Sequence, residues 1–233
     1  MARRPARRSA SSGPAAPSPP PQSPSPRDAA IDAFLDLLAE KRIEAIGLNE
    51  VAARAGLSLA ELRGEFDSTL AILAAFVKRI DRQVLAGGDA DMEEEPPRDR
   101  LFDVLMRRIE AMAPYRAAVR SLIRSVRRNP GLALALNRIA VHSQQWMLTA
   151  AGIDAAGPKG MIRAQGLAVL FSRVLREFAE DDEDNARTMA ALDHALARGQ
   201  RWAGFLDELC HFVPKPRRRR RRYRDEDDEA YAG

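Results

Sequence analysis

The chain has 233 residues, of which 45% are hydrophobic and 30% are charged, a composition typical of a globular protein. Its single cysteine, Cys210, excludes an internal disulfide, and no apolar run approaches the ~20 residues that a helix needs to cross a bilayer. The formal net charge of +4 is unevenly distributed, because segments 1–27 and 215–233 carry +5 and +3 and leave −4 for the rest.

Residues 1–27 contain eight prolines and five arginines and have almost nothing to bury. This composition predicts a disordered tail. A segment rich in arginine and serine and without acidic residues is also typical of a cleaved targeting segment. Its prolines, however, oppose the amphipathic helix that such a segment forms. The other end, 214–233, is polybasic and then acidic, and we expect it to be disordered as well.

A small helical domain is predicted at 28–86. An apolar stripe with helical spacing runs from Ile31 to Leu38, and a second helix follows at Leu48–Ala55. Gly56 suits the position after the end of that helix, while Ser58 and Glu61 predict a capping box at the start of a third. A fourth helix follows Ser68, and the acidic segment 86–99 marks a domain boundary.

Residues 98–213 predict a larger helical domain without strands. We expect a helix from Arg98 that carries Leu101, Leu105, Ile109 and Met112, and a next helix with Pro114 in its first turn. Further helices are expected over Pro130–Ala151, over Met161–Phe178 and around Ala186–Arg198, with a loop at 152–160 and a final segment from Trp202 to Val213. The fold class predicted from this pattern is all-α.

The stretch "LNEVAARAGLSLAELRGEF" at 48–66 has the outline of a helix-turn-helix, and the whole arrangement resembles the TetR superfamily. Further stretches resemble one branch, the bacterial relatives of the ninth coenzyme Q biosynthesis protein. They are "RDRLFDVLMRRIEAMAPYR" (98–116), "AGID" (151–154), "RTMAALD" (187–193) and "RGQRW" (198–202). The resemblance implies a homodimer whose C-terminal domain binds an isoprenoid lipid and presents it to a quinone-biosynthesis hydroxylase.

Whether the helix-turn-helix binds DNA is left open by its residues. The outward residues available for contact with DNA are Ser58, Leu59, Ala60, Arg63 and Gly64. Glu61 and Glu65 oppose binding, and residues 28–86 carry ten acids against seven Lys and Arg. Because nucleic-acid affinity depends largely on neutralised phosphates, this charge disfavours DNA, whereas the arginine-rich tails favour it.

A lipid pocket is predicted between helices of the second domain, lined by Leu105, Met106, Ile109, Trp146, Met147, Leu170, Phe171 and Val174. No charged residue projects into this set, which suits an isoprenoid chain. Methionines adapt to flexible ligands, although they also fill ordinary cores.

The end of the second domain predicts contact with a membrane surface. Trp202, Phe205, Leu206 and Leu209 follow helical spacing, and Lys215 and the arginines at 217–222 come directly after them. An apolar stripe beside a basic cluster favours an anionic membrane. A final helix packed on its own domain, with a solvated tail, accounts for the pattern equally well.

The three histidines and the cysteine form no catalytic or metal-binding pattern, so we expect neither enzymatic activity nor a cofactor. The leading hypothesis is a lipid-binding accessory protein of ubiquinone biosynthesis, located in the cytoplasm with access to the inner membrane. The alternative is a TetR-type, ligand-responsive, DNA-binding transcriptional regulator.

Overall fold

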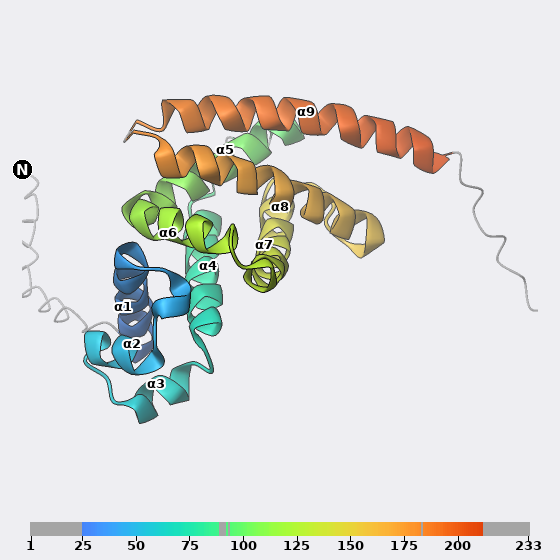
Figure 1. Ribbon diagram of the computed structural model, residues 1–233. Coiled ribbons are helices and arrows are strands. Elements are labelled where there is room, and N and C mark those ends of the chain that lie inside the picture. Colours follow the sequence, from blue (N-terminus) through green and yellow to red (C-terminus); the bar gives the residue numbers. More distant parts are fainter. Residues whose placement is uncertain (1–24, 89–91, 93, 183, 212–233) are drawn as a thin grey trace, which may run out of the picture. The chain divides into compact units, whose positions relative to one another are not determined.

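The computed structural model describes residues 25–88, 92, 94–182 and 184–211, with 200–211 described in backbone only. All regular secondary structure in these ranges is helical (Figure 1), as the sequence periodicity predicts. The chain divides into two compact units. The first comprises the residues up to Arg79 together with Ala117–Asn129, and the second comprises Ile80–Arg116 and the residues from Pro130 onward.

The first unit is built from short helices whose ends follow local rules. Its elements are α1 (Pro26–Glu40), η1 (Ile43–Ala45), α2 (Leu48–Ala55), α3 (Leu59–Glu65), the first part of α4 (Thr69–Ala86) and most of α6 (Arg116–Val126). Ser25 caps α1 by accepting a hydrogen bond from the Asp28 backbone N–H at 3.1 Å. Gly56 ends α2 with φ 68°, a left-handed conformation that favours glycine. The predicted second helix and its C-terminal glycine are therefore confirmed.

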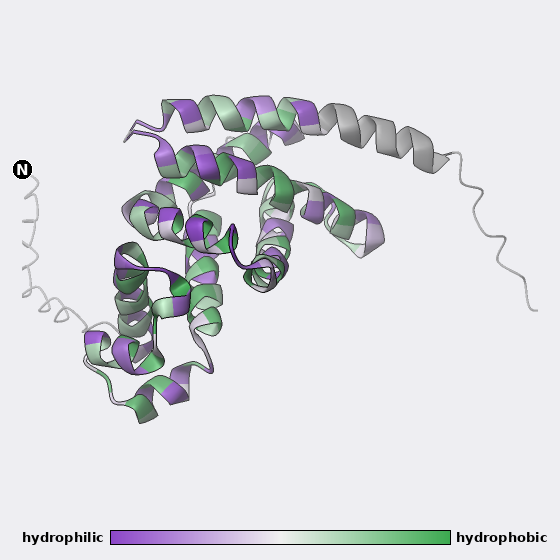
Figure 2. Ribbon diagram, viewed as in Figure 1, coloured by the Kyte–Doolittle hydropathy of each residue, from purple (hydrophilic) through white to green (hydrophobic). Residues whose placement is uncertain are grey.

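The centre of the first unit is formed by the apolar side of α1. Phe34, Leu37 and Leu38 are fully buried, and α1 packs against α2 and α3. Figure 2 shows hydrophobic positions running along α1. Complete burial of a Leu or Phe side chain contributes about 1.5–3 kcal/mol to folding, so this side of α1 supports the helices around it.

α6 belongs to the first unit, although its neighbours in the sequence, α5 and α7, belong to the second. The Ser121 hydroxyl donates to the Lys41 carbonyl at 2.7 Å, and the Ile43 backbone N–H donates to the Ser125 hydroxyl at 3.4 Å. Both serines are buried, so these bonds fasten α6 to the end of α1 and to η1. Residues 117–129 fall inside the predicted second domain of 98–213, yet they pack here.

The second unit contains longer helices. It begins with the last part of α4. Its other elements are α5 (Pro97–Met112), η3 (Ala113–Tyr115), α7 (Pro130–Ala150), α8 (Gly157–Glu180) and α9 (Ala186–His211). α7 packs against α5 and α8, and α8 lies beside α9 (Figure 1). The side-chain amides of Asn137 and Gln165 exchange hydrogen bonds of 2.9 and 3.0 Å, which tie α7 to α8.

Two helices of the second unit are longer than the sequence predicts. α8 begins at Gly157 rather than at Met161. Pro158 is well suited to the first turn of a helix, because backbone N–H groups there have no hydrogen-bond partner within the helix. α9 is continuous through Gly199, where the sequence predicts two separate segments. A lone glycine weakens a helix by about 1 kcal/mol but does not end it. A Cβ at Gly199 would lie 3.5 Å from Leu170 Cδ1, so this residue packs on α8.

Candidate functional site

α3, the helix that would contact DNA, is held in place by buried apolar side chains. Leu62 is 1% exposed and Phe66 is 4% exposed, and Val51 of α2 is fully buried. With 7 residues, α3 is too short to be stable alone in water. Its position therefore depends on these contacts within the first unit.

Glu61, one of the two acids of α3, is engaged at the start of the helix. The Ser58 hydroxyl accepts a hydrogen bond from the Glu61 backbone N–H at 3.2 Å, and the Glu61 carboxylate accepts one from the Ser58 backbone N–H at 2.8 Å. This is the predicted capping box, now confirmed. The hydrogen bond from the Ser58 backbone N–H is the main cause, and the one from the Ser58 hydroxyl the second, that lowers the pKa of Glu61 below its ordinary value. The carboxylate thus folds back on its own helix.

Glu65, the second acid of α3, is paired with Arg27 at the start of α1. The Arg27 guanidinium donates to the Glu65 carboxylate at 3.4 Å and to the Glu65 carbonyl at 3.3 Å. The same group lies 4.6 Å from the centre of the Phe66 ring, within range of a cation–π contact. The exposed ion pair adds only ~0–1 kcal/mol of stability. Its effect is to neutralise Glu65 and to bring the end of the arginine-rich segment 1–27 beside α3.

The outer side of α3 presents the residues predicted to contact DNA. All of them are exposed: Ser58, Leu59, Ala60, Arg63 and Gly64. Arg63 pairs with Asp67 at the surface, a contact that water screens and that a phosphate could replace. A Cβ added to Gly64 would meet nothing within 4 Å, so packing does not require glycine at this position. Glycine leaves the helix backbone bare on its outer side and permits close approach of a ligand.

The residues predicted to bind lipid come from α5, α7 and α8 of the second unit. Six of them are buried: Leu105, Met106, Ile109, Met147, Phe171 and Val174. Leu170 is half-buried. Trp146 is 58% exposed and does not belong to the buried set. α7 buries Met147, and the adjacent position projects about 100° away around the helix.

A charged pair lies among these apolar residues. Arg108 and Asp81 are 5% and 7% exposed and form an ion pair. The Ser143 hydroxyl donates to the same Asp81 carboxylate at 2.7 Å. The Arg108 guanidinium carbon lies 5.5 Å from the centre of the Phe171 ring. The expectation that no charged residue projects into this set is therefore wrong.

The sequence contained a signal for this pair. Arg108 follows Leu105 by three positions and so lies on the apolar stripe of α5, and Asp81 follows Val77 of α4 by four. Charged residues are almost never fully buried unless they are paired, so two opposite charges on apolar helix faces predict a buried ion pair.

Two buried polar side-chain atoms of the second unit have no hydrogen-bond partner among the described residues. They are Arg108 Nε and Gln144 Oε1, and Gln144 is 2% exposed. A buried polar atom without a partner costs about 1–3 kcal/mol. We call Asp81, Arg108 and Ser143 the buried polar cluster.

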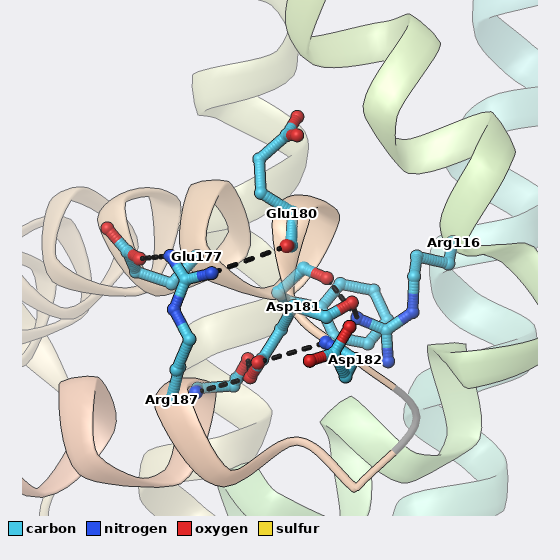
Figure 3. A network of polar contacts seen from close by, with 8 residues as sticks. Arg116, Glu177, Glu180, Asp181, Asp182 and Arg187 are labelled. Atoms are coloured by element: carbon cyan, nitrogen blue, oxygen red, sulfur yellow. Dashed lines mark hydrogen bonds and ion pairs between the residues drawn. The ribbon is translucent and has the colours of Figure 1, made fainter.

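A cleft of about 600 Å³ lies at the α8–α9 turn, lined by Ala113, Arg116, Asp181 and Asp182. Figure 3 shows the polar contacts of Arg116 and Asp181. Arg116 donates to the Asn185 side chain at 2.7 Å, and Asp181 accepts from the Thr188 backbone N–H and hydroxyl, both at 2.6 Å. Burial opposes ionisation of Asp181, but the hydrogen bonds from Thr188 lower the pKa of the carboxyl below its ordinary value. These contacts join α8 to α9, so we assign the cleft a structural role.

The residues predicted to face a membrane lie outside the part of the chain whose side chains the structure describes. They are Trp202, Phe205, Leu206 and Leu209, and the arginines at 217–222 follow the last described residue. The backbone of α9 is helical as far as His211. Among the described helices, none is long and apolar enough to cross a membrane.

The sequence matches no protein-family model and no curated protein. Solved structures do match. A TetR transcriptional regulator from Nitrosomonas europaea ATCC 19718 is 24% identical, with a TM-score of 0.57 over 74% of this chain and 96% of that chain. A TetR transcriptional regulator from Rhodococcus sp. RHA1 is 23% identical, with a TM-score of 0.51 over 74% of this chain and 94% of that chain. The chain therefore has the all-α fold of the TetR transcriptional regulators.

Proposed function

We propose that this protein is a TetR-type transcriptional regulator that binds duplex DNA through α3 and responds to a small ligand in its second unit. The observation that carries the proposal is the internal pairing of both acids of α3. Glu61 is turned back onto its cap but keeps its charge, whereas the charge of Glu65 is offset by Arg27. One of the two negative charges that the sequence shows at this helix is thereby offset, and the other is directed toward the start of the helix.

The arginine-rich segment 1–27 supports the same function. Arg27 lies against Phe66, at the end of α3. Four further arginines precede it in the sequence: Arg3, Arg4, Arg7 and Arg8. Basic arms of this kind contact phosphates or enter the minor groove next to a helix-turn-helix.

The chain path provides a physical link between the two units. α4 runs continuously from one into the other, and α6 packs in the first unit while both its neighbours in the sequence pack in the second. If these connections couple the two units, a ligand that binds two arrangements of the second unit unequally changes the populations of two arrangements of the first.

Dimerisation is part of the proposal, because a dimer binds two half-sites about one helical turn of DNA apart. Ile162 and Val169 of α8 are 62% and 45% exposed, and seven positions place them on one helix face. We expect Ile162→Glu with Val169→Glu to convert a dimer to a monomer, as measured by light scattering. Lys78→Glu, at an exposed position of α4 in the first unit, is the control. A double variant that remains dimeric would place the interface elsewhere.

The test of DNA binding is selection of duplexes from a random library by the full-length protein. We expect a sequence with two related half-sites to be enriched. Gly64→Ala should stabilise α3 by about 0.5–1 kcal/mol, because alanine is the better helix former. Gly64→Leu fills the same open space with a larger group and should abolish enrichment while the protein stays folded. Equal enrichment by the wild type and Gly64→Leu would exclude α3 as the DNA contact.

A lipid-binding accessory role in ubiquinone biosynthesis is the second candidate. The stretches at 98–116 and 187–193 and the buried apolar residues of α5, α7 and α8 favour it. The buried Asp81–Arg108 pair weighs against a wholly apolar isoprenoid pocket, and the structural similarities are to transcriptional regulators. Co-purification of an isoprenoid lipid with a protein that enriches no duplex would favour the accessory role. The same result would favour a quinone-biosynthesis hydroxylase and an anionic membrane surface as the partners of this protein.

A further inference from the structure

We propose that a row of arginines on α6 and the turn after it binds the phosphates of a second DNA segment, so that the protein bridges two duplexes. The inference rests on the proposed function, because it adds a second contact to the one that α3 makes. The row consists of Arg120, Arg124, Arg127 and Arg128, all within the first unit. We call these four residues the α6 arginine face.

The α6 arginine face is strongly positive on a unit that is otherwise acidic. Segment 117–129 holds four arginines and no acid, a net charge of +4. Residues 25–79 hold nine acids against seven Lys and Arg, a net charge of −2. Glu44 lies at the edge of the face, where its carboxylate accepts a hydrogen bond from the Asn129 side chain at 3.4 Å. One carboxylate does not neutralise four guanidinium groups.

Three of these arginines present their charges to solvent. Arg124, Arg127 and Arg128 are exposed, and none of them forms an ion pair within the described part of the chain. By contrast, Arg27 and Arg54 of the same unit are paired with acids. Cations near the end of a helix also interact favourably with its dipole, so a role in helix stability is the competing explanation.

The α6 arginine face lies at the opposite end of α1 from α3 (Figure 1). Arg27, at the start of α1, contacts Glu65 of α3. Lys41, directly after the end of α1, accepts the hydrogen bond from Ser121 of α6. α1 has 15 residues and is therefore about 22 Å long. The major groove that α3 would enter is only about 8.5 Å deep, so a straight duplex on α3 does not reach α6. Phosphates on the α6 arginine face therefore belong to a different segment of DNA.

The chemistry of the face favours phosphates over a protein partner. Arg120 and Arg128 are eight residues apart, about 12 Å at the rise of a helix, and duplex DNA carries about seven charges over that length. Guanidinium groups can donate two parallel hydrogen bonds to one phosphate. Protein partners bind through buried apolar or aromatic anchors, whereas the strongly exposed large apolar residue in the described part of the first unit is Leu59, on α3.

The test captures a second duplex on protein that is already bound to DNA. The selected duplex is attached to beads, full-length protein is added, and retention of a labelled scrambled duplex is measured at about 0.1 M salt. We expect Arg124→Gln with Arg127→Gln and Arg128→Gln, the α6 variant, to lower retention at least ~10-fold. The slope of log affinity against log salt should fall by about 2.7, which is about 0.9 for each of three lost phosphate contacts. Binding of the selected duplex itself should not change.

Arg82→Gln with Arg138→Gln and Arg176→Gln is the matched control, because it removes three exposed arginines of the second unit. The control should retain the labelled duplex as the wild type does. Equal retention by the wild type and the α6 variant would overturn the proposal, and so would a wild type that retains no second duplex. A lower melting temperature of the α6 variant with unchanged retention would assign the arginines to the helix dipole alone.

Two further measurements separate this proposal from its neighbours. Polyglutamate that binds the wild type as tightly as the scrambled duplex does, and that fails to bind the α6 variant, would identify an acidic protein as the partner and overturn the proposal. If the protein selects no duplex, so that the regulator function fails, fluorescence anisotropy with the scrambled duplex alone still tests the face. The salt slope of the wild type should then exceed that of the α6 variant by about 2.7, and equal slopes would refute the site.

Discussion

Replacing Arg108 by Met is expected to lower the free energy of unfolding by about 3–5 kcal/mol, the cost of leaving one partner of a buried ion pair alone. Asp81 is 7% exposed, and without Arg108 it would keep the hydrogen bond from the hydroxyl of Ser143. Urea denaturation followed by circular dichroism measures the effect.

Two variants serve as controls for Arg108→Met. The double variant Asp81→Leu with Arg108→Met removes both charges, and we expect it to regain most of the lost stability, because a buried ion pair contributes little net stability relative to apolar residues. Arg138→Met makes the same substitution at an exposed position of α7 and should change stability by no more than ~0.5 kcal/mol. Equal free energies of unfolding for the Arg108→Met and Arg138→Met variants would mean that the Asp81–Arg108 pair is not buried.

Removing residues 1–24 is expected to weaken DNA binding strongly and to reduce its dependence on salt. The deletion eliminates Arg3, Arg4, Arg7 and Arg8 but leaves Arg27 on Phe66. Each phosphate contact contributes about 0.9 to the slope of log affinity against log salt, so the slope should fall by about 3–4. Fluorescence anisotropy on a selected duplex over a range of salt concentrations measures it.

The control for this deletion replaces the same four arginines by glutamine, which keeps the length of the segment. We expect the substituted protein to match the deletion. A slope that neither change affects would restrict DNA contact to the described part of the first unit. Arg27→Gln tests the separate claim that this residue neutralises Glu65, and it should weaken binding without altering the melting temperature appreciably, because the pair is exposed.

The parts of the fold that follow local rules could be predicted from the sequence. Gly56 and the Ser58–Glu61 capping box depend on residues within one turn of each other, and both occur where they were expected. The continuity of α9 could not be predicted in this way. Gly199 looks like a break in the sequence, and only its contact with Leu170 of α8 shows that it packs within a helix.

The chemistry of the candidate sites depends on pairs that are distant in the sequence. Glu65 looks unfavourable for DNA until Arg27, 38 residues earlier, is found beside it. Asp81 and Arg108, 27 residues apart, each lie on an apolar helix face, but only the structure shows that they face each other. Helical spacing identifies the apolar side of each helix, but it does not specify which residue of another helix faces it. Trp146 is 58% exposed, and the identity of a large apolar side chain does not show which side of α7 is buried.

The most direct test of the central claim is the ratio of two dissociation constants, measured with the full-length protein at about 0.15 M salt. One is for the duplex obtained by selection and the other for a scrambled duplex of the same length and composition. The account predicts that the selected duplex binds at least about 10³-fold more tightly, as specific regulators do. A ratio near one, with both constants in the non-specific range of about 10⁻⁴–10⁻⁶ M, would contradict it.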